Sequence, residues 1–139
     1  MKFVIVTGMS GAGRSTAMKM MEDMGFYCID NLPIPLLDKL ADLTTCLDKE
    51  IEKVAVGIDV RSGDGFDNID STLELLEKKN FDYEILFLDA EDEVLIKRYK
   101  ETRRNHPLAK EQRINTGIVL ERKKVESIKK KADYIIDTS

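Results

Sequence analysis

The stretch Gly8-Met9-Ser10-Gly11-Ala12-Gly13-Arg14-Ser15 decides how this chain folds. An apolar, β-branched run at 3–6 precedes it, and a helix-like segment at 15–24 follows it. A strand, a glycine loop and a helix in this order are the context that a P-loop requires. Glycines let backbone N–H groups approach phosphate oxygens without a Cβ in the way, and the helix N-terminus adds partial positive charge. The stretch therefore predicts a loop that binds the phosphates of a nucleotide.

One position departs from the standard motif, because Arg14 stands where a P-loop has lysine. Arginine keeps the positive charge and binds phosphate as a fork, but it is not a compact charge that follows a transferring phosphoryl group. Ser15 stands where a hydroxyl would ligate Mg²⁺. We expect Arg14 to contact the β- and γ-phosphates and expect the remaining loop residues to bind the nucleotide: Gly8, Met9, Ser10, Gly11, Ala12, Gly13 and Ser15. The alternative is a glycine turn with no ligand.

The composition predicts a single globular domain over residues 1–139, with 42% hydrophobic and 35% charged residues. No apolar run approaches the roughly 20 residues that cross a bilayer, so we expect no membrane association. An N-terminal strand that leads into the loop is unlike a signal peptide. Cys28 and Cys46 lack metal-site spacing and fit a reducing cytoplasm, and a single histidine excludes a multi-histidine metal site.

The net charge of −4 conceals an uneven distribution. Residues 97–131 contain thirteen Lys and Arg but only four Glu, a net of +9, which leaves −13 for the rest. A basic block of this kind binds phosphate-rich ligands such as nucleotide or RNA. The alternative is a solvated basic helix face, above all at 123–131. Tyr99 is the only aromatic residue in the block, which weakens a model of base stacking.

Hydrophobic periodicity predicts alternating strands and helices along the whole chain. We expect strands at 2–7, 26–29, 54–58, 83–88 and 134–136, and helices at 15–24, 35–47, 68–79, 91–102 and 111–131. Methionines 18, 20, 21 and 24 are expected to pack in the core. The pattern predicts an α/β protein of the P-loop NTPase type, a three-layer sandwich with a central parallel five-stranded sheet. Because the chain stops just after the fifth strand, we expect a domain of a longer protein.

Three aspartates follow predicted strands, where parallel sheets bind their ligands. Asp59 is the first choice for holding Mg²⁺, because its strand is expected beside the P-loop strand. Asp30 is expected to face an acceptor hydroxyl, whereas a turn or helix-cap role explains Asp89 equally well. The geometry of strand ends predicts that all three approach one crevice.

Arginines after the fourth predicted strand are candidates for a lid that brings positive charge onto the phosphates. These are Arg98, Arg103 and Arg104. Arg98 and Arg103 are five residues apart, which is not same-face spacing on a helix, so they need not act together. A structural salt bridge is the alternative for each of them. His106, before Pro107, is expected to be a turn residue.

The chain resembles the N-terminal domain of the RapZ/YvcJ nucleotide-binding proteins, a family of RNase adapters. The resemblance covers essentially the whole chain, and its most specific part is the string Glu22-Asp23-Met24-Gly25-Phe26-Tyr27-Cys28-Ile29-Asp30-Asn31-Leu32-Pro33. The other matching segments are the P-loop, 59–62, 86–90, 98–99, 102–104, 106–108, 132–133 and 136–139. The family normally has lysine at position 14. The layout is more distantly similar to nucleoside monophosphate kinases.

The resemblance implies a kinase-like P-loop fold with ATP at Gly8 to Ser15 and a guanine-nucleotide motif at Asp59, Val60, Arg61 and Ser62. It also implies weak, Mg²⁺-dependent ATPase and GTPase activity in the cytoplasm. In the best-known members a separate C-terminal domain binds small regulatory RNA, so RNA binding is expected mainly from a part that this chain lacks. A homo-oligomer is possible for the full-length protein.

Three functions follow from these observations. The first is a regulatory domain that binds ATP or GTP and hydrolyses it slowly, with Arg14, Asp59, Arg98 and Arg103 as the catalytic residues and Ser15 and Asp59 at the metal. The second is a small-molecule kinase in which Asp30 receives the proton of an acceptor hydroxyl. The third is a non-catalytic module whose basic block at 97–131 contacts RNA or a protein.

Overall fold

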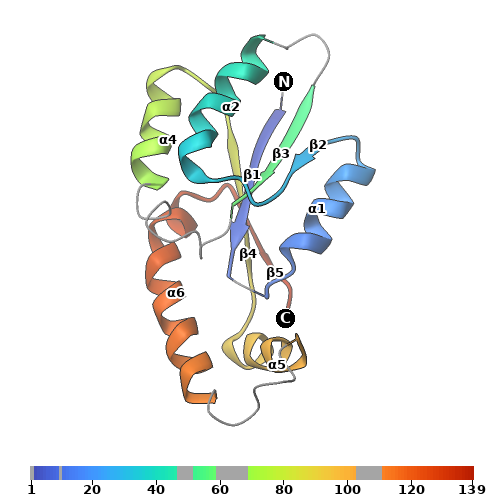
Figure 1. Ribbon diagram of the computed structural model, residues 1–139, viewed down its shortest axis with the longest axis vertical. Helices are drawn as coiled ribbons and strands as arrows, with labels where there is room; N and C mark the ends of the chain where they lie inside the picture. Colours follow the sequence, from blue (N-terminus) through green and yellow to red (C-terminus); the bar gives the residue numbers. More distant parts are fainter. Residues whose placement is uncertain (1, 10, 47–51, 59–68, 103–110) are drawn as a thin grey trace.

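The computed structural model describes residues 2–9, 11–46, 52–58, 69–102 and 111–139. Its elements are those labelled in Figure 1. The strands are β1 (Lys2–Gly8), β2 (Tyr27–Ile29), β3 (Lys53–Gly57), β4 (Glu84–Asp89) and β5 (Tyr134–Asp137). The helices are α1 (Arg14–Asp23), α2 (Ile34–Cys46), α4 (Ile69–Lys78), α5 (Asp92–Thr102) and α6 (Glu111–Lys131). The predicted boundaries agree with these to within about two residues.

The strands form one parallel sheet in the order β2-β3-β1-β4-β5, so β1 lies at its centre. In the register of the sheet, Val4 is paired with Ala55 of β3, and Val6 is paired with Leu86 of β4. Residues 3–7 of β1 are all buried, as expected for a strand that has helices on both faces and strands on both sides. The predicted five-stranded parallel sheet is confirmed.

The helices cover the two faces of the sheet unequally (Figure 1). Helix α1 lies on one face, and α2, α4 and α6 lie on the other, where α4 packs against both α2 and α6. The result is the three-layer sandwich that the alternating pattern predicted. Within the described part of the chain, no helix is both long and apolar enough to cross a membrane.

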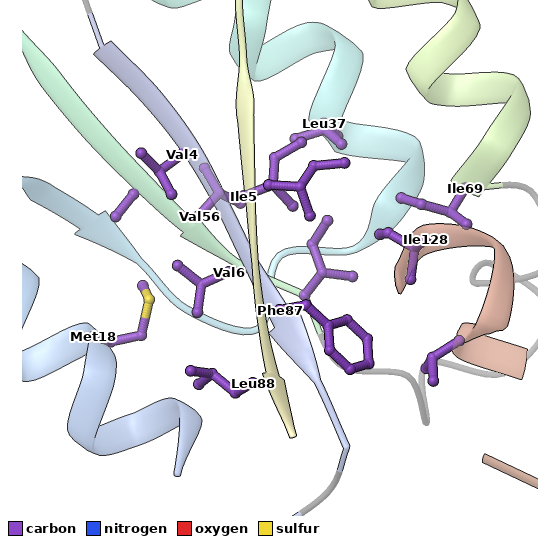
Figure 2. Close-up of a cluster of buried hydrophobic side chains, with 14 of the residues drawn as sticks. Val4, Ile5, Val6, Met18, Leu37, Val56, Ile69, Phe87, Leu88 and Ile128 are labelled. Atoms are coloured by element: carbon purple, nitrogen blue, oxygen red, sulfur yellow. The ribbon is translucent and has the colours of Figure 1, made fainter. Parts of the chain in front are cut away.

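The core lies on both faces of β1, because alternate side chains of a strand point in opposite directions. Figure 2 shows Val4 and Val6 on the side of Met18 in α1, and Ile5 on the side of Leu37 in α2. All five side chains are at most 5% exposed. Burying an aliphatic side chain of this size contributes about 1.5–3 kcal/mol, so the central strand is a main source of stability.

The expectation that four methionines of the first helix pack in the core is wrong for two of them. Met18 is buried and Met21 packs against the core, whereas Met20 and Met24 are 62% and 65% exposed. Residues three apart, such as Met18 and Met21, share the helix stripe that faces the sheet. Met20 and Met24 are four apart and lie on the other stripe, which no described element covers.

Candidate functional site

The glycine loop connects the central strand to the first helix at the carboxyl edge of the sheet. Its fold is fixed by backbone hydrogen bonds, from the Met9 N–H to the Leu88 carbonyl (3.0 Å) and from the Ala12 N–H to the Met9 carbonyl (3.1 Å). Gly13 is the N-cap of α1 and has a left-handed φ of 97°. It has no side chain to cap the first turn, so the turn presents backbone N–H groups and the positive end of the helix dipole to a ligand.

Arg14, the first residue of α1, reaches the end of strand β2. Its Nη2 donates a hydrogen bond to Asn31 Oδ1 (2.7 Å), and its Nε lies 3.2 Å from Asp30 Oδ1 in an ion pair. The Arg14 side chain is 23% exposed, and that of Asp30 is 35% exposed. The loop cation expected on phosphates and the carboxylate expected to face an acceptor are therefore paired with each other.

Asp30 and Asn31 belong to a turn that is attached to the neighbouring strand β3. The Leu32 N–H donates to the Gly57 carbonyl (3.0 Å), and the Asn31 N–H donates to Asp30 Oδ1 (2.9 Å). A Cβ at Gly57 would lie 2.1 Å from Asp30 Oδ1. Only glycine at position 57 leaves room for this carboxylate, so β3 helps to position it.

Asp89 lies apart from Asp30 in the sheet, and its carboxylate is bound by residues of α6. It accepts hydrogen bonds from Arg122 Nη1 (3.0 Å), Lys129 Nζ (2.8 Å) and the Ala90 N–H (2.8 Å), so its carboxylate connects β4 to α6. Strands β2 and β4 are three strand spacings apart in the sheet, which separates their ends by about 14 Å. Asp89 is a structural residue, close to the turn role that was its alternative.

Arg98 of α5 contacts the loop itself. Its Nη1 donates to the Gly11 carbonyl (3.0 Å) and to Thr138 Oγ1 (3.0 Å), and its Nη2 donates to the Thr138 carbonyl. The Thr138 hydroxyl in turn donates to the Ala12 carbonyl (2.8 Å). Arg98 thus lies at the predicted site, where it binds backbone carbonyls of the loop and the end of β5.

Several predicted site residues lie outside the described residues: Ser10, Asp59, Val60, Arg61, Ser62, Arg103, Arg104 and His106. The strand before Asp59 is described, and β3 pairs with β1 as expected. Ile58 is held beside the loop strand, since its N–H donates to the Val6 carbonyl (3.0 Å) and its carbonyl accepts from Thr7 Oγ1 (3.1 Å).

The described side chains near the loop fit Mg²⁺ better than a metal ion that is held entirely by protein ligands. Among the described residues, no three His, Cys, Asp or Glu side chains gather closely enough to hold a metal. Ser15 is exposed in the first turn of α1. Mg²⁺ keeps several waters and uses few protein ligands together with substrate phosphates, so one hydroxyl is a suitable partner.

Four basic side chains near the end of the basic block form ion pairs within the protein. Arg122 pairs with Asp89 and Asp92, Lys129 with Asp89, Lys130 with Glu126 and Lys131 with Asp70. These pairs support a solvated, salt-bridged helix face for 122–131, which was the alternative to a nucleic-acid surface.

Asn31 and Thr138 contact the loop residues, and neither was predicted as a site residue. Asn31 directly follows Asp30 at the end of β2, and Thr138 directly follows β5. The rule that selected the strand-end aspartates also covers these positions. Amide and hydroxyl side chains at strand ends are therefore a signal for the site in addition to carboxylates.

Comparisons with known proteins agree with this geometry. The family model described as the RapZ-like N-terminal domain matches residues 1–139. A nucleotide-binding protein of Agathobacter rectalis is 74% identical over 139 residues, which are all of this chain and 48% of that protein. A nucleotide-binding protein of Caldanaerobacter subterraneus is 60% identical over 100% of this chain and 49% of its own length. The chain therefore spans about half the length of these curated relatives.

Solved structures establish the same fold at low sequence identity. A shikimate kinase from Bacteroides thetaiotaomicron superimposes with a TM-score of 0.63 at 19% identity, covering 99% of this chain and 86% of the other. The YorR protein of Bacillus subtilis, solved in complex with phosphorylated GDP, gives a TM-score of 0.61 at 19% identity and the same coverage. The likeness shows that the fold is that of the P-loop kinases.

Proposed function

The chain belongs to the RapZ-like N-terminal domain family, and we propose that it binds ATP or GTP with Mg²⁺ at residues 8–15 and hydrolyses it slowly. The observation that carries the proposal is the loop between β1 and α1, where Gly13 begins the helix and Arg14 adds a cation. The names of the curated relatives and the GDP complex of YorR support a nucleotide as the ligand.

In this proposal the backbone N–H groups of the loop and the first turn of α1 bind the phosphates. Arg14 supplies positive charge beside the terminal phosphates, and Arg98 supports the loop through the Gly11 carbonyl. Ser15 and Asp59 would hold Mg²⁺, which supplies neutralising charge to the phosphates when bound. Arg103 is proposed to act with them in hydrolysis, and residues 59–62 are proposed to recognise guanine.

The contacts of Asp30 favour a nucleotide-binding domain over a small-molecule kinase. A general base has to be within reach of the acceptor hydroxyl, but Asp30 Oδ1 accepts the Asn31 N–H within its own turn. For the whole protein, about twice this length in the relatives, we propose a cytoplasmic regulator that can oligomerise. RNA binding in it would reside mainly in the other half.

Calorimetric titration of ATP and GTP with Mg²⁺ into this chain and into Arg14→Lys tests the proposal, with hydrolysis followed on the same samples. Both forms are expected to bind, and the lysine form is expected to hydrolyse faster, because a lysine follows the transferring phosphoryl group. Lys123→Ala, an exposed change on α6, is the control and should bind like the parent. Absence of binding by both the parent and Arg14→Lys at millimolar nucleotide would refute the proposal.

A further inference from the structure

Arg14 is bound by two acceptors from consecutive residues at the end of β2. Its Nη2 donates a hydrogen bond to Asn31 Oδ1 (2.7 Å). Its Nε lies 3.2 Å from Asp30 Oδ1 in an ion pair that is not a hydrogen bond. A planar fork suits two neighbouring acceptors, whereas a lysine ammonium has no such edge. The contact with Asp30 and Asn31 therefore depends on arginine at position 14, where the standard motif has lysine.

The acceptor turn is built in a way that keeps both oxygens in place. Asp30 Oδ1 lies where a side chain at Gly57 would have to be, 2.1 Å from an ideal Cβ. The same oxygen accepts the Asn31 N–H (2.9 Å), and Asn31 itself has a left-handed φ of 54°. Asparagine tolerates this conformation better than most residues. The turn therefore holds both acceptor oxygens through contacts within the protein.

We propose that Asp30 and Asn31 are a latch that competes with the nucleotide triphosphate for Arg14. While Nη2 donates to Asn31 and the guanidinium is paired with the Asp30 carboxylate, the same Nη2 N–H and the same charge cannot contact a phosphate. The Asp30 carboxylate also repels an approaching phosphate. Binding of the triphosphate then requires Arg14 to leave the latch, so the latch lowers affinity and raises the nucleotide concentration at which the domain responds. This inference rests on the proposed function.

The expected size of the effect follows from the exposure of the pair. Arg14 and Asp30 are 23% and 35% exposed, so the pair is partly screened by water. Ion pairs of this kind contribute up to about 1 kcal/mol. If only the molecules with an open latch can bind the nucleotide, the apparent dissociation constant is the intrinsic one divided by the fraction of open molecules. Opening the latch should therefore tighten binding by about two- to sixfold.

The experiment is a calorimetric titration of Mg²⁺–ATP and Mg²⁺–GTP into the parent chain, Asp30→Asn and Asn31→Gly. Asp30→Asn should bind about two- to sixfold more tightly. Asn31→Gly should bind about twofold more tightly, since it removes one neutral acceptor and glycine keeps the left-handed backbone. Asp82→Asn, an exposed change after α4, should leave affinity unchanged. Thermal unfolding of each variant verifies that it is folded.

A second readout needs no nucleotide. The Nε–H signal of Arg14 in a ¹⁵N–¹H spectrum, assigned by its loss in Arg14→Lys, should shift in Asp30→Asn and on addition of Mg²⁺–ATP to the parent. An unchanged signal in folded Asp30→Asn would overturn the latch. So would tighter binding by Asp30→Asn without any gain in Asn31→Gly, which would mean charge repulsion alone. If the parent binds and neither variant gains, only the latch fails; if no form binds, the proposed function fails and the latch fails with it.

Discussion

Gly8, the last residue of β1, lies directly against the backbone of β4 where the loop begins. Its φ is +148°, and a Cβ on it would lie 2.1 Å from the carbonyl oxygen of Leu88. The next residue, Met9, donates its N–H to that same carbonyl at 3.0 Å. A side chain at position 8 would therefore separate β1 from β4 at the point where the loop begins.

Gly8→Ala is expected to lower the free energy of unfolding by roughly 2–4 kcal/mol, because backbone atoms rather than a flexible side chain oppose the new methyl group. Chemical denaturation measures the change. Gly117→Ala in α6 is the matched control, since a Cβ there meets nothing within 4 Å. It should stabilise the protein by about 0.5–1 kcal/mol through helix propensity. Equal stability of Gly8→Ala and the parent would contradict the close contact.

At the scale of elements, α6 is attached to the sheet through both apolar and charged contacts. Val125 and Ile128 are buried, and Arg122 and Lys129 hold the carboxylate of Asp89 at the end of β4. Burial raises the pKa of Asp89, but the hydrogen bonds from Lys129, the Ala90 N–H and Arg122 outweigh it. The pKa of Asp89 therefore lies below its ordinary value.

This lowered pKa predicts a pH dependence of stability. The ionised form of Asp89 is favoured in the folded state, so its contribution is complete above the unfolded pKa of about 3.9. That contribution is lost as the pH falls through the lower folded pKa. Asp89→Asn should cost about 1–3 kcal/mol at pH 7 and lose less stability than the parent between about pH 5 and 2. Denaturation across this range measures both effects, and Glu74→Gln, an exposed change on α4, should follow the parent.

At the scale of the whole molecule, the segment that follows β5 at the C-terminal end of the chain meets the loop that follows β1. The Thr138 hydroxyl and the Ala12 carbonyl are 126 positions apart in sequence and 2.8 Å apart in space. Arg98 donates to Thr138 and to the Gly11 carbonyl, so α5, β5 and the loop form one hydrogen-bonded group. The strand order makes this possible, because β5 lies only two strands from β1.

Thr138→Val should loosen this group while keeping the shape of the side chain. The loss of a hydrogen bond to Ala12 and of an acceptor for Arg98 is expected to cost about 1–2 kcal/mol. Backbone amides of residues 11–17 should exchange hydrogen faster as a result, as measured by native-state hydrogen exchange. Thr16→Val, an exposed change on α1, is the control for the effect of replacing a threonine with valine where the hydroxyl has no role in this group. Unchanged exchange in folded Thr138→Val would show that β5 does not support the loop.

Part of the site could be read directly from the order of residues. The glycines at 8–13, the apolar run before them and the periodic helix after them are local patterns, and local patterns specify a strand, a loop and a helix. The continuous apolar runs of β1 and β3 also predicted that these two strands would be neighbours in the sheet, as they are. Arg98, predicted as a lid residue after the fourth strand, contacts the loop through the Gly11 carbonyl. Its proposed action on phosphates stays a prediction.

The partners of individual side chains depended on the tertiary structure. Arg14 meets Asp30 and Asn31 because a turn attached to β3 brings the end of β2 beside α1. Asp89 is paired because α6 returns across β4 with cations on its inner stripe. The sequence by itself determined the fold class, the loop and the elements, since these follow from local periodicity and backbone chemistry. Only the tertiary structure decided which charges meet, because strand order and helix placement set distances between residues far apart in the chain.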